Sequence, residues 1–456
     1  MLCSFTKRTK TFFPLRGFFM QIELANQKNC VSFMCQEICK VLKKTYYIGF
    51  LLFVTCQLVK AQGFDFANPK QQSARISFKL SNNLIILPLL LNKHKDTLNF
   101  VLDTGVGHTL LTDSSFIRKL HLDTNKLRKV PIKGGGIGEI ITTYVVPMQK
   151  LTIANFVAPF QSVLVVSKSL TYLSQYAGIR IDGIVGYDFF RNLTVKIDYQ
   201  KKELTVFKPN FFEKKYLKKY DTKNILGLQL QRQKPYIKAF VSTENNDTIA
   251  VKLLLDTGAG HWVSLDLQAH KGIKLPKKYI ESNLGLAING LVVGKIGRLP
   301  TFKIGHFEWK NVICSYPDSL LVAFRNEYVE KDGSIGIGIL ERFTLILDYS
   351  KERCIFEPNL KLNKNFDIGF SGLEIASDAK NYCQYFIVGI HHLSQAYSSG
   401  LQIGDEIFSV NNIIASRLTI GQLYELLDSV ENKLIQMLVK RNGDFHIVTF
   451  RTKRFI

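Results

Sequence analysis

The sequence is poor in cysteine over most of its length. Five of its eight cysteines lie within the first 61 residues, which leaves only Cys314, Cys354 and Cys383 in the rest of the chain. Three scattered cysteines exclude a disulfide framework, although Cys314 and Cys354 leave open either one bond or two buried thiols. No His/Cys cluster has the spacing of zinc ligands, and no phosphate-binding Gly-Lys-Ser/Thr loop is present. We therefore expect neither a metal site nor a cofactor.

Acidic residues and long apolar runs are also scarce. The chain has 60 Lys and Arg against 37 Asp and Glu, a formal net charge of +23. Nine of these basic and two of these acidic residues precede residue 62, so the remainder carries about +16. Such a charge favours anionic surfaces or acidic substrates in a salt-dependent way. No nucleic-acid motif accompanies it, so we expect no nucleic-acid partner.

One apolar run near the N-terminus predicts export. It spans residues 46–59, follows several lysines, and leads to Val59-Lys60-Ala61. This pattern is typical of a secretory signal peptide, with cleavage between Ala61 and Gln62. We therefore expect a periplasmic, cell-envelope or secreted protein whose presequence is residues 1–61.

Two alternatives remain open for this segment. It could stay uncleaved as an anchor, which would be the chain's membrane contact, but the run is short for a span. Cys56 could instead mark a lipoprotein site, although the residues before it match poorly. A start at Met34 would give a signal of ordinary length, so we suspect that Met1 is too early.

An Asp-Thr-Gly triplet occurs twice, each time after an apolar run that is typical of a strand. The first copy is Asp103-Thr104-Gly105 and the second is Asp256-Thr257-Gly258. A repeat of about 150 residues extends around them. Asp182-Gly183-Ile184-Val185-Gly186 corresponds to Asp332-Gly333-Ser334-Ile335-Gly336, and an Asp-Tyr pair follows each. Two matching carboxylates suggest a pair that activates a water molecule.

At these residues the chain resembles the retropepsin-like aspartic proteases, most closely the single-chain bacterial type with two lobes and a C-terminal PDZ domain. The resemblance implies that Asp103 and Asp256 are the catalytic pair. Thr104 and Thr257 would join the two loops by hydrogen bonds across a pseudo-twofold axis, and Gly105 and Gly258 would admit the backbone close to the carboxylates. Ile184-Val185-Gly186 and Ile335-Gly336 would pack against these loops, with Ser334 departing from the first copy's Ile184.

The resemblance implies peptide-bond hydrolysis on protein or peptide substrates. Two carboxylates at one site do not both ionise readily, so one is protonated and the other charged. The charged one can take a proton from water while the other donates to the scissile carbonyl. Because both halves of the site lie in one chain, we expect a monomer.

A glycine-rich stretch follows the first Asp and is a flap candidate. Gly135-Gly136-Ile137-Gly138 resembles a retropepsin flap tip, although Gly-Gly is also a plain hairpin signal. The second half has a looser equivalent at Asn289–Gly294. His108 and His261 each follow a triplet; either could tune a carboxyl pKa, but we favour a structural role.

Short apolar and β-branched runs separated by Gly, Asn and Asp predict a mainly β fold. We expect two β-barrel lobes, residues 62–210 and 211–360, related by a pseudo-twofold axis. Helices are expected only in pieces such as Ser114–Leu120 and Leu267–Lys271. The basic run around Lys214–Lys219 is interpreted as part of a solvated interlobe linker.

The C-terminal residues 365–453 predict a small α+β PDZ domain. Ser394-Gln395-Ala396, Gly400-Leu401 and Gly404-Asp405-Glu406-Ile407 resemble its signature. A PDZ groove binds a peptide as an added strand. The candidate edge is Ser371, Gly372, Leu373, Glu374 and Ile375, and the flanking helix is Thr419–Ser429.

Three functions remain open. The first is an exported aspartic endopeptidase whose PDZ domain recruits or positions protein substrates. The second is a catalytically silent two-lobe scaffold that binds peptides or proteins. The third is a processing enzyme for one dedicated partner. The presence of both aspartates and both Thr-Gly pairs favours the first.

Overall fold

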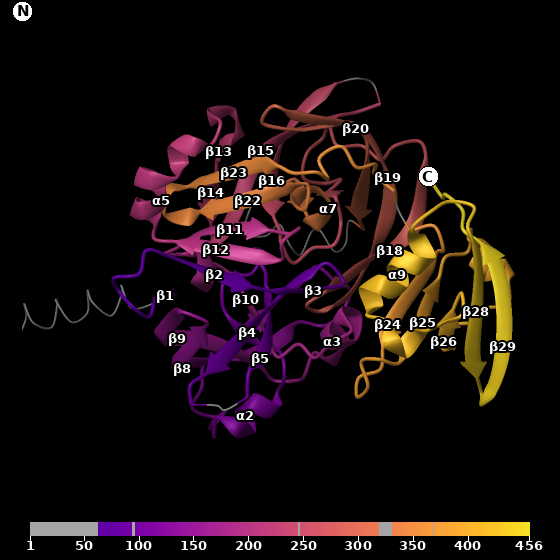
Figure 1. The fold of residues 1–456 in the computed structure, drawn as a ribbon, viewed down its shortest axis with the longest axis horizontal. Coiled ribbons are helices and arrows are strands. Elements are labelled where there is room, and N and C mark those ends of the chain that lie inside the picture. The colour runs from indigo at the N-terminus through magenta and orange to yellow at the C-terminus, as the bar shows by residue number, and fades with distance from the viewer. Residues whose placement is uncertain (1–62, 94–95, 245–246, 319–330, 368) are drawn as a thin grey trace, which may run out of the picture. The chain divides into compact units, whose positions relative to one another are not determined.

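The computed structural model describes residues 63–93, 96–244, 247–318, 331–367 and 369–456. The proposed signal segment and its cleavage site lie outside these residues. Strands dominate the described chain (Figure 1), which confirms a mainly β fold with two similar β-rich lobes. Among the described helices, none is long and apolar enough to cross a membrane.

The sheet of the first lobe is centred on a buried strand that leads to Asp103. β5 pairs antiparallel with β4 and parallel with β10, so it is enclosed on both edges. Phe100 and Leu102 on β5 are fully buried, as expected for an apolar run in the middle of a sheet. The order is β1-β9-β6-β10-β5-β4-β8-β7, with β3 beside β4. The strands are β1 (Asp65–Phe66), β3 (Lys79–Ser81), β4 (Leu84–Leu91), β5 (Leu98–Leu102), β6 (Leu110–Leu111), β7 (Lys129–Ile132), β8 (Ile141–Ile153), β9 (Phe156–Val166) and β10 (Gly183–Val185).

The sheet of the second lobe repeats this arrangement around the strand that leads to Asp256. β16 lies between antiparallel β15 and parallel β21, as β5 lies between β4 and β10. The order is β14-β15-β16-β21-β17-β20-β19-β18. The strands are β14 (Gln229–Gln231), β15 (Lys234–Ser242), β16 (Thr248–Leu255), β17 (Val263–Leu265), β18 (Tyr279–Ala287), β19 (Gly290–Ile304), β20 (Phe307–Pro317) and β21 (Gly333–Ile335).

A third sheet joins the lobes and carries their symmetry axis. In it β11 pairs antiparallel with β22, and Lys196 lies opposite Ile346. These residues are counterparts in the repeat, so a pseudo-twofold axis passes through this pair. The order is β13-β23-β22-β11-β12-β2. The strands are β2 (Ser73–Ser77), β11 (Thr194–Asp198), β12 (Glu203–Phe207), β13 (Ile225–Gly227), β22 (Phe343–Asp348) and β23 (Arg353–Pro358).

One buried apolar cluster runs through both lobes and the joining sheet. Phe100 and Leu102 of the first lobe, Leu253 and Leu255 of the second and Leu347 of the joining sheet all belong to it. The strands that end at the two aspartates are therefore fixed in one continuous core. Short helices lie at the edges: α2 (Ser115–Lys119), α3 (Thr171–Ala177), α4 (Tyr187–Phe190), α7 (Ile337–Leu340) and the 3₁₀ turn η3 (Tyr349–Lys351).

The segment between the lobes is helical and packed, whereas we predicted a solvated linker. It contains α5 (Pro209–Lys215) and the 3₁₀ turns η1 (Leu217–Lys219) and η2 (Thr222–Asn224). Phe212 is fully buried, and Tyr216 and Tyr220 stack against it. Phe212 lies on α5, Tyr216 directly follows it, and Tyr220 follows η1, so the end of the helix and the next turn bring the three rings together. The lysines between them concealed this cluster in the sequence.

The C-terminal domain, residues 369–456, has its own core. Its sheet order is β24-β25-β26-β28-β29, with β27 beside β26, and Ile387, Leu423 and Met437 are among the fully buried residues. Thr419 and Gln422 form a capping box at the start of α9. The elements are β24 (Leu373–Ser377), β25 (Tyr385–Ile390), α8 (Gln395–Ser398), β26 (Glu406–Val410), β27 (Ile413–Ile414), η4 (Ala415–Arg417), α9 (Ile420–Asp428), β28 (Leu434–Arg441) and β29 (Asp444–Arg451).

The structure corrects one predicted helix and decides between the two alternatives for Cys314 and Cys354. The short helix predicted at Leu267–Lys271 is wrong: the chain forms turns, closed by Ala269 N donating to Asp266 O at 3.0 Å, and Gly272 follows before a helix can form. Cys314 and Cys354 are both free thiols buried in the second lobe.

Candidate active site

Asp103 and Asp256 occupy matching positions at the ends of β5 and β16. Asp103 N donates to Val185 O, and Asp256 N donates to Ile335 O, both at 2.9 Å. The parallel pairing of β5 with β10 and of β16 with β21 continues into these two bonds. Each aspartate is thus held by the second apolar-Gly element of its own lobe, as the resemblance implies.

The two carboxyl groups lie side by side, because a Cβ atom placed on Gly105 would be 3.0 Å from both Asp103 Oδ1 and Asp256 Oδ2. Gly105 N donates to Asp103 Oδ1 at 2.7 Å, and Gly258 N donates to Asp256 Oδ1 at 3.0 Å. A Cβ atom on Gly258 would collide with the Asp103 carboxyl group, and one on Gly105 would press on both carboxyl groups. The glycines of the triplets are therefore required by the close approach of the two loops.

The two threonines bond across the axis in a reciprocal pattern. Thr104 N donates to Thr257 Oγ1 at 3.1 Å, and Thr257 N donates to Thr104 Oγ1 at 3.0 Å. Each hydroxyl also donates to the residue before the opposite aspartate: Thr104 Oγ1 to Leu255 O at 2.5 Å and Thr257 Oγ1 to Leu102 O at 3.0 Å. Both threonines are fully buried. These four bonds fix the separation of the two loops.

The pair retains a proton more readily than an isolated aspartate. Burial raises the pKa of the Asp103 carboxyl well above its ordinary value, and the neighbouring Asp256 carboxyl adds to this rise. The Gly105 N–H and the positive charge of Lys234 act in the opposite direction. Two adjacent carboxylates repel each other, so the first to ionise makes the second harder to ionise.

The apolar-Gly elements support the loops in both lobes but differ in chemistry. A Cβ on Gly186 would collide with Asp103 O and Val106 O, and one on Gly336 would collide with Ala259 O. In the second lobe Ser334 Oγ lies 3.0 Å from His261 Nε2, whereas the first lobe has apolar Ile184 and an exposed His108. His261 therefore contacts Ser334, the residue at which the second copy of the element differs from the first.

The flap candidates of the two lobes meet each other. The first is the turn of residues 133–140 between β7 and β8, which contains Gly135, Gly136, Ile137 and Gly138. The second is the tip of the β18–β19 hairpin, where Ile288 and Asn289 link the paired residues Ala287 and Gly290. Ile137 N donates to Leu291 O at 2.8 Å.

The candidate peptide edge lies on β24, at one margin of the C-terminal sheet. Ser371 and Leu373 are buried, and Ser371 N donates to Asp428 Oδ1 at 2.7 Å. Gly372 has a φ of +72°, which favours glycine. Glu374 accepts from Asn283 at 2.9 Å, and Ile375 N donates to Tyr424 Oη of α9 at 2.9 Å.

Sequence reasoning missed several residues around the pair. Lys234 follows the turn between β14 and β15 and acts electrostatically on Asp103. Tyr349 of the second lobe is buried and stacks on Phe190 of the first, with ring centroids 5.2 Å apart. The repeated Asp-Tyr pair was a signal for Tyr349. Nothing in the sequence pointed to Lys234, which is brought there by a long-range contact.

A second polar contact supports the loop of the first lobe alone. Asp188 Oδ2 accepts from Thr109 N at 2.8 Å and from Thr109 Oγ1 at 2.7 Å. At the corresponding positions the second lobe has Trp262 packed directly on Gly338. The same structural position is therefore held by a buried polar pair in one lobe and by an aromatic ring in the other.

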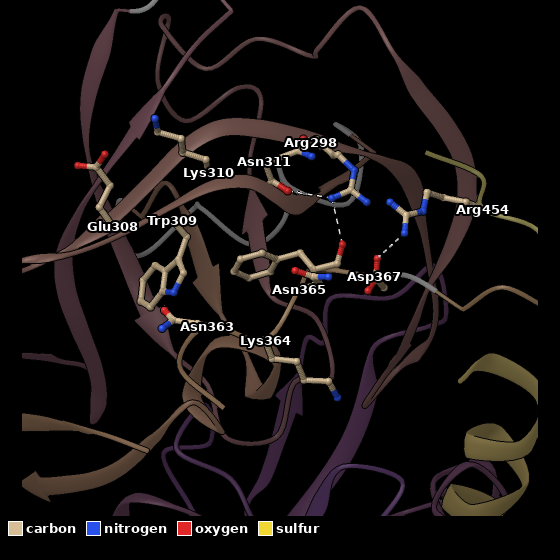
Figure 2. Close-up of a pocket in the computed structure, with 11 residues that line it drawn as sticks. Arg298, Glu308, Trp309, Lys310, Asn311, Asn363, Lys364, Asn365, Asp367 and Arg454 are labelled. Carbon is tan, nitrogen blue, oxygen red and sulfur yellow. Dashed lines mark hydrogen bonds and ion pairs between the residues drawn. The ribbon is translucent and has the colours of Figure 1, made fainter. Parts of the chain in front are cut away.

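A cavity of about 420 Å³ lies at the junction of β19 with the segment leading to the C-terminal domain (Figure 2). Its arginines are engaged by the chain itself: Arg298 Nη1 donates to Asn311 O at 2.8 Å, and Arg454 pairs with Asp367 at 3.3 Å. No residue of the two Asp-Thr-Gly loops lines it. Within the described residues, no group of three or more His, Cys, Asp or Glu is placed to hold a metal ion.

Comparison with known proteins agrees with this geometry. The aspartyl protease family matches the chain at residues 87–189 and again at 241–339, and each match contains one Asp-Thr-Gly triplet and its apolar-Gly element. No curated protein sequence matches the chain. The double match supports a retropepsin-like, two-lobe aspartic protease, and hence a peptidase among the hydrolases.

Proposed function

We propose that the chain is an exported aspartic endopeptidase in which Asp103 and Asp256 activate a water molecule. The observation that carries the proposal is the adjacency of the two carboxyl groups, in loops tied by reciprocal threonine bonds. A shared proton gives the site one acid and one base at the same place, which is what addition of water to an amide requires.

The residues suffice for a balanced reaction. Asp256 as carboxylate takes a proton from water, whose oxygen attacks the scissile carbonyl carbon. Asp103, whose raised pKa keeps its proton, donates it to the carbonyl oxygen and leaves a tetrahedral diol. Asp256 then gives its proton to the amide nitrogen, Asp103 takes one from the diol, and the carbon–nitrogen bond breaks. Both carboxyl groups return to their starting states.

The proposal includes export and a PDZ role for the C-terminal domain. Export rests on the apolar run of residues 46–59 and on the small residue Ala61 at the suggested cut. The PDZ role rests on an edge strand, β24, whose Ile375 N and O both bond to the Tyr424 hydroxyl of α9. A peptide added along β24 would replace Tyr424 at Ile375 and form backbone bonds there.

Cleavage of a diverse peptide library from pH 3 to 8 tests the proposal. The mature chain, residues 62–456, is compared with Asp103→Asn and Asp256→Asn. Cleavage lost in both variants supports the pair and reveals the preferred sequence. No cleavage at any pH, together with failure to bind a statine-type transition-state mimic, would favour a silent scaffold. Binding of the mimic without library cleavage would favour an enzyme with one dedicated partner.

A further inference from the structure

The tips of the two flap candidates are joined by one side chain. Asn289 Oδ1 accepts from Gly136 N at 2.6 Å, and Asn289 Nδ2 donates to Gly136 O at 2.8 Å and to Gly138 O at 3.1 Å. A single carboxamide of the second lobe thus bonds three backbone groups of the first lobe's glycine-rich turn. The Ile137–Leu291 backbone bond lies beside it.

The glycines of this turn are explained by the contact and not by backbone conformation. None of Gly134, Gly136 and Gly138 has a positive φ, so their backbone does not favour glycine. A Cβ on Gly134 would collide with the Asn289 side chain. A Cβ on Gly136 would collide with Gly290, and one on Gly138 with the Asn289 backbone. The amino-acid sequence of the turn therefore suits the docked arrangement.

The hairpin that carries Asn289 is anchored next to the Asp103 loop. Ile288 packs into an apolar cluster of the first lobe that includes Val106, Ile132, Ile141 and Ile184. Val106 directly follows Gly105, and Ile132 and Ile141 flank the glycine-rich turn. Tyr172 Oη of α3 donates to Ile288 O. The hairpin tip and the residue that follows the Asp103 triplet therefore pack against one apolar cluster.

The opposite side of the hairpin rests on the C-terminal domain. Asn283 Nδ2 of β18 donates to Glu374 Oε2 at 2.9 Å. His391 Nε2 lies 3.1 Å from Glu281 O, and because a carbonyl only accepts, His391 must be the donor. Two positions on β18 are thus held, so Asn289 extends from a supported strand.

We propose that Asn289 is a positioning residue for the reaction: it holds the glycine-rich turn of the first lobe closed over the Asp103/Asp256 pair. The proposal rests on the proposed function for its kinetic consequence but not for its structural one. A peptide held beneath closed flaps keeps its scissile bond next to the two carboxyl groups. Small displacements of a substrate lower the rate by large factors.

Amide hydrogen exchange tests the contact without requiring activity. In the full chain, Asn289→Ala should accelerate exchange of the Gly136 amide at least ten-fold, because its acceptor is lost. Asn289→Asp keeps an acceptor but loses both donated bonds, so protection should fall less. Ser282→Ala, on the same strand, serves as the matched control and should leave exchange at Gly136 unchanged. Equal exchange in Asn289→Ala and the parent chain would overturn the proposal.

Steady-state kinetics test the positioning role. Asn289→Ala should lower kcat about ten-fold or more, with a smaller change in KM and an unaltered shape of the pH profile, since the carboxyl pair is untouched. A rise in kcat/KM would overturn the proposal, because the contact would then obstruct the cleft. If the parent chain cleaves no peptide, the proposed function fails, and the exchange experiment still decides whether Asn289 holds the turn.

A double variant distinguishes docking from local strain. Gly136→Ala should by itself lower the activity and the protection of the amide at position 136 from exchange, because the added Cβ collides with Gly290. Once Asn289→Ala has undocked the tips, adding Gly136→Ala should change little, so the two effects should be strongly non-additive. Additive effects would mean that the glycine serves its own turn, contrary to the proposal.

Discussion

Ser334 Oγ lies 3.0 Å from His261 Nε2, and this contact has no equivalent in the first lobe. The corresponding positions there are Ile184, which belongs to an apolar cluster, and the exposed His108. Each lobe therefore presents a different chemistry beside its aspartate. Both Ile184 and Ser334 are buried, so this difference lies beneath the two loops.

The Ser334 contact can be tested by placing isoleucine, the first lobe's residue at the corresponding position, at position 334. Ser334→Ile removes the hydroxyl and adds bulk beside His261, so we expect the free energy of unfolding to fall by about 1–3 kcal/mol. Ser334→Ala removes the hydroxyl alone and should cost less. Urea denaturation at neutral pH measures both. Equal stability of Ser334→Ile and the parent chain would show that the contact contributes nothing.

The cross-lobe threonine bonds should be needed for both stability and activity. Thr104→Ala leaves Leu255 O and Thr257 N buried without their partner, at a cost of about 1–3 kcal/mol for each unsatisfied group. Thr104→Ser keeps the hydroxyl and should retain most of the stability and cleavage. Denaturant unfolding and peptide cleavage should be measured on the same samples. Full activity in Thr104→Ala would contradict a role for these bonds in setting the carboxyl separation.

The raised pKa of Asp103 makes the stability of the fold depend on pH. Between the ordinary aspartate pKa, about 3.9, and the raised one, the folded chain binds more protons than the unfolded chain, so stability falls as pH rises. Asp103→Asn removes this loss. We therefore expect its stability relative to the parent chain to be greater at pH 7 than at pH 3 in urea unfolding. A pH-independent difference would mean that Asp103 titrates as an ordinary aspartate.

Lys234 should set the position of the pH–activity profile. Its positive charge opposes the rise in the Asp103 pKa, so Lys234→Met should raise that pKa further and move the profile toward higher pH. Lys234→Arg retains the charge and should leave the profile in place. The measurement is kcat/KM from pH 3 to 8. Identical profiles for Met and Arg variants would exclude an electrostatic role.

Arg342 should be irreplaceable by lysine. It is buried, donates to Gly338 O and Leu362 O at 3.0 Å, and lies 3.9 Å from the Phe366 ring centroid. A lysine has neither the planar group nor the directed donors, so Arg342→Lys should cost about 2–4 kcal/mol. The exposed Arg118→Lys is the control and should be neutral. Thermal and urea unfolding would reveal whether the two substitutions differ.

The sequence predicted what is local or repeated. The strands before both aspartates end where the triplets begin, because apolar runs stopped by polar turns are local signals. The partnership of Asp103 with Asp256 followed from the repeat. α5 was missed because its lysines suggested a solvated segment, although Phe212 and Tyr216 supplied a helical spacing.

Contacts between distant segments could not be predicted in the same way. Lys234 approaches Asp103 only because the β14–β15 hairpin of the second lobe reaches the first lobe. No local sequence pattern predicts this contact. Asn289 was included in a loose flap equivalent, but its three bonds to the opposite turn depend on how two lobes meet. Glu374 and His391 likewise contact β18 through a domain interface.

The bond between Gly136 and Asn289 also bears on how a chain of two repeats can evolve. The two tips are not copies of each other, because the turn that contains Gly136 spans eight residues and the one that contains Asn289 spans two. An asparagine can bond to a glycine-rich turn in this way only when the two tips differ. In a homodimer of identical chains both tips would have the same length and sequence. A single chain with two repeats is free of this constraint, because each copy can mutate alone.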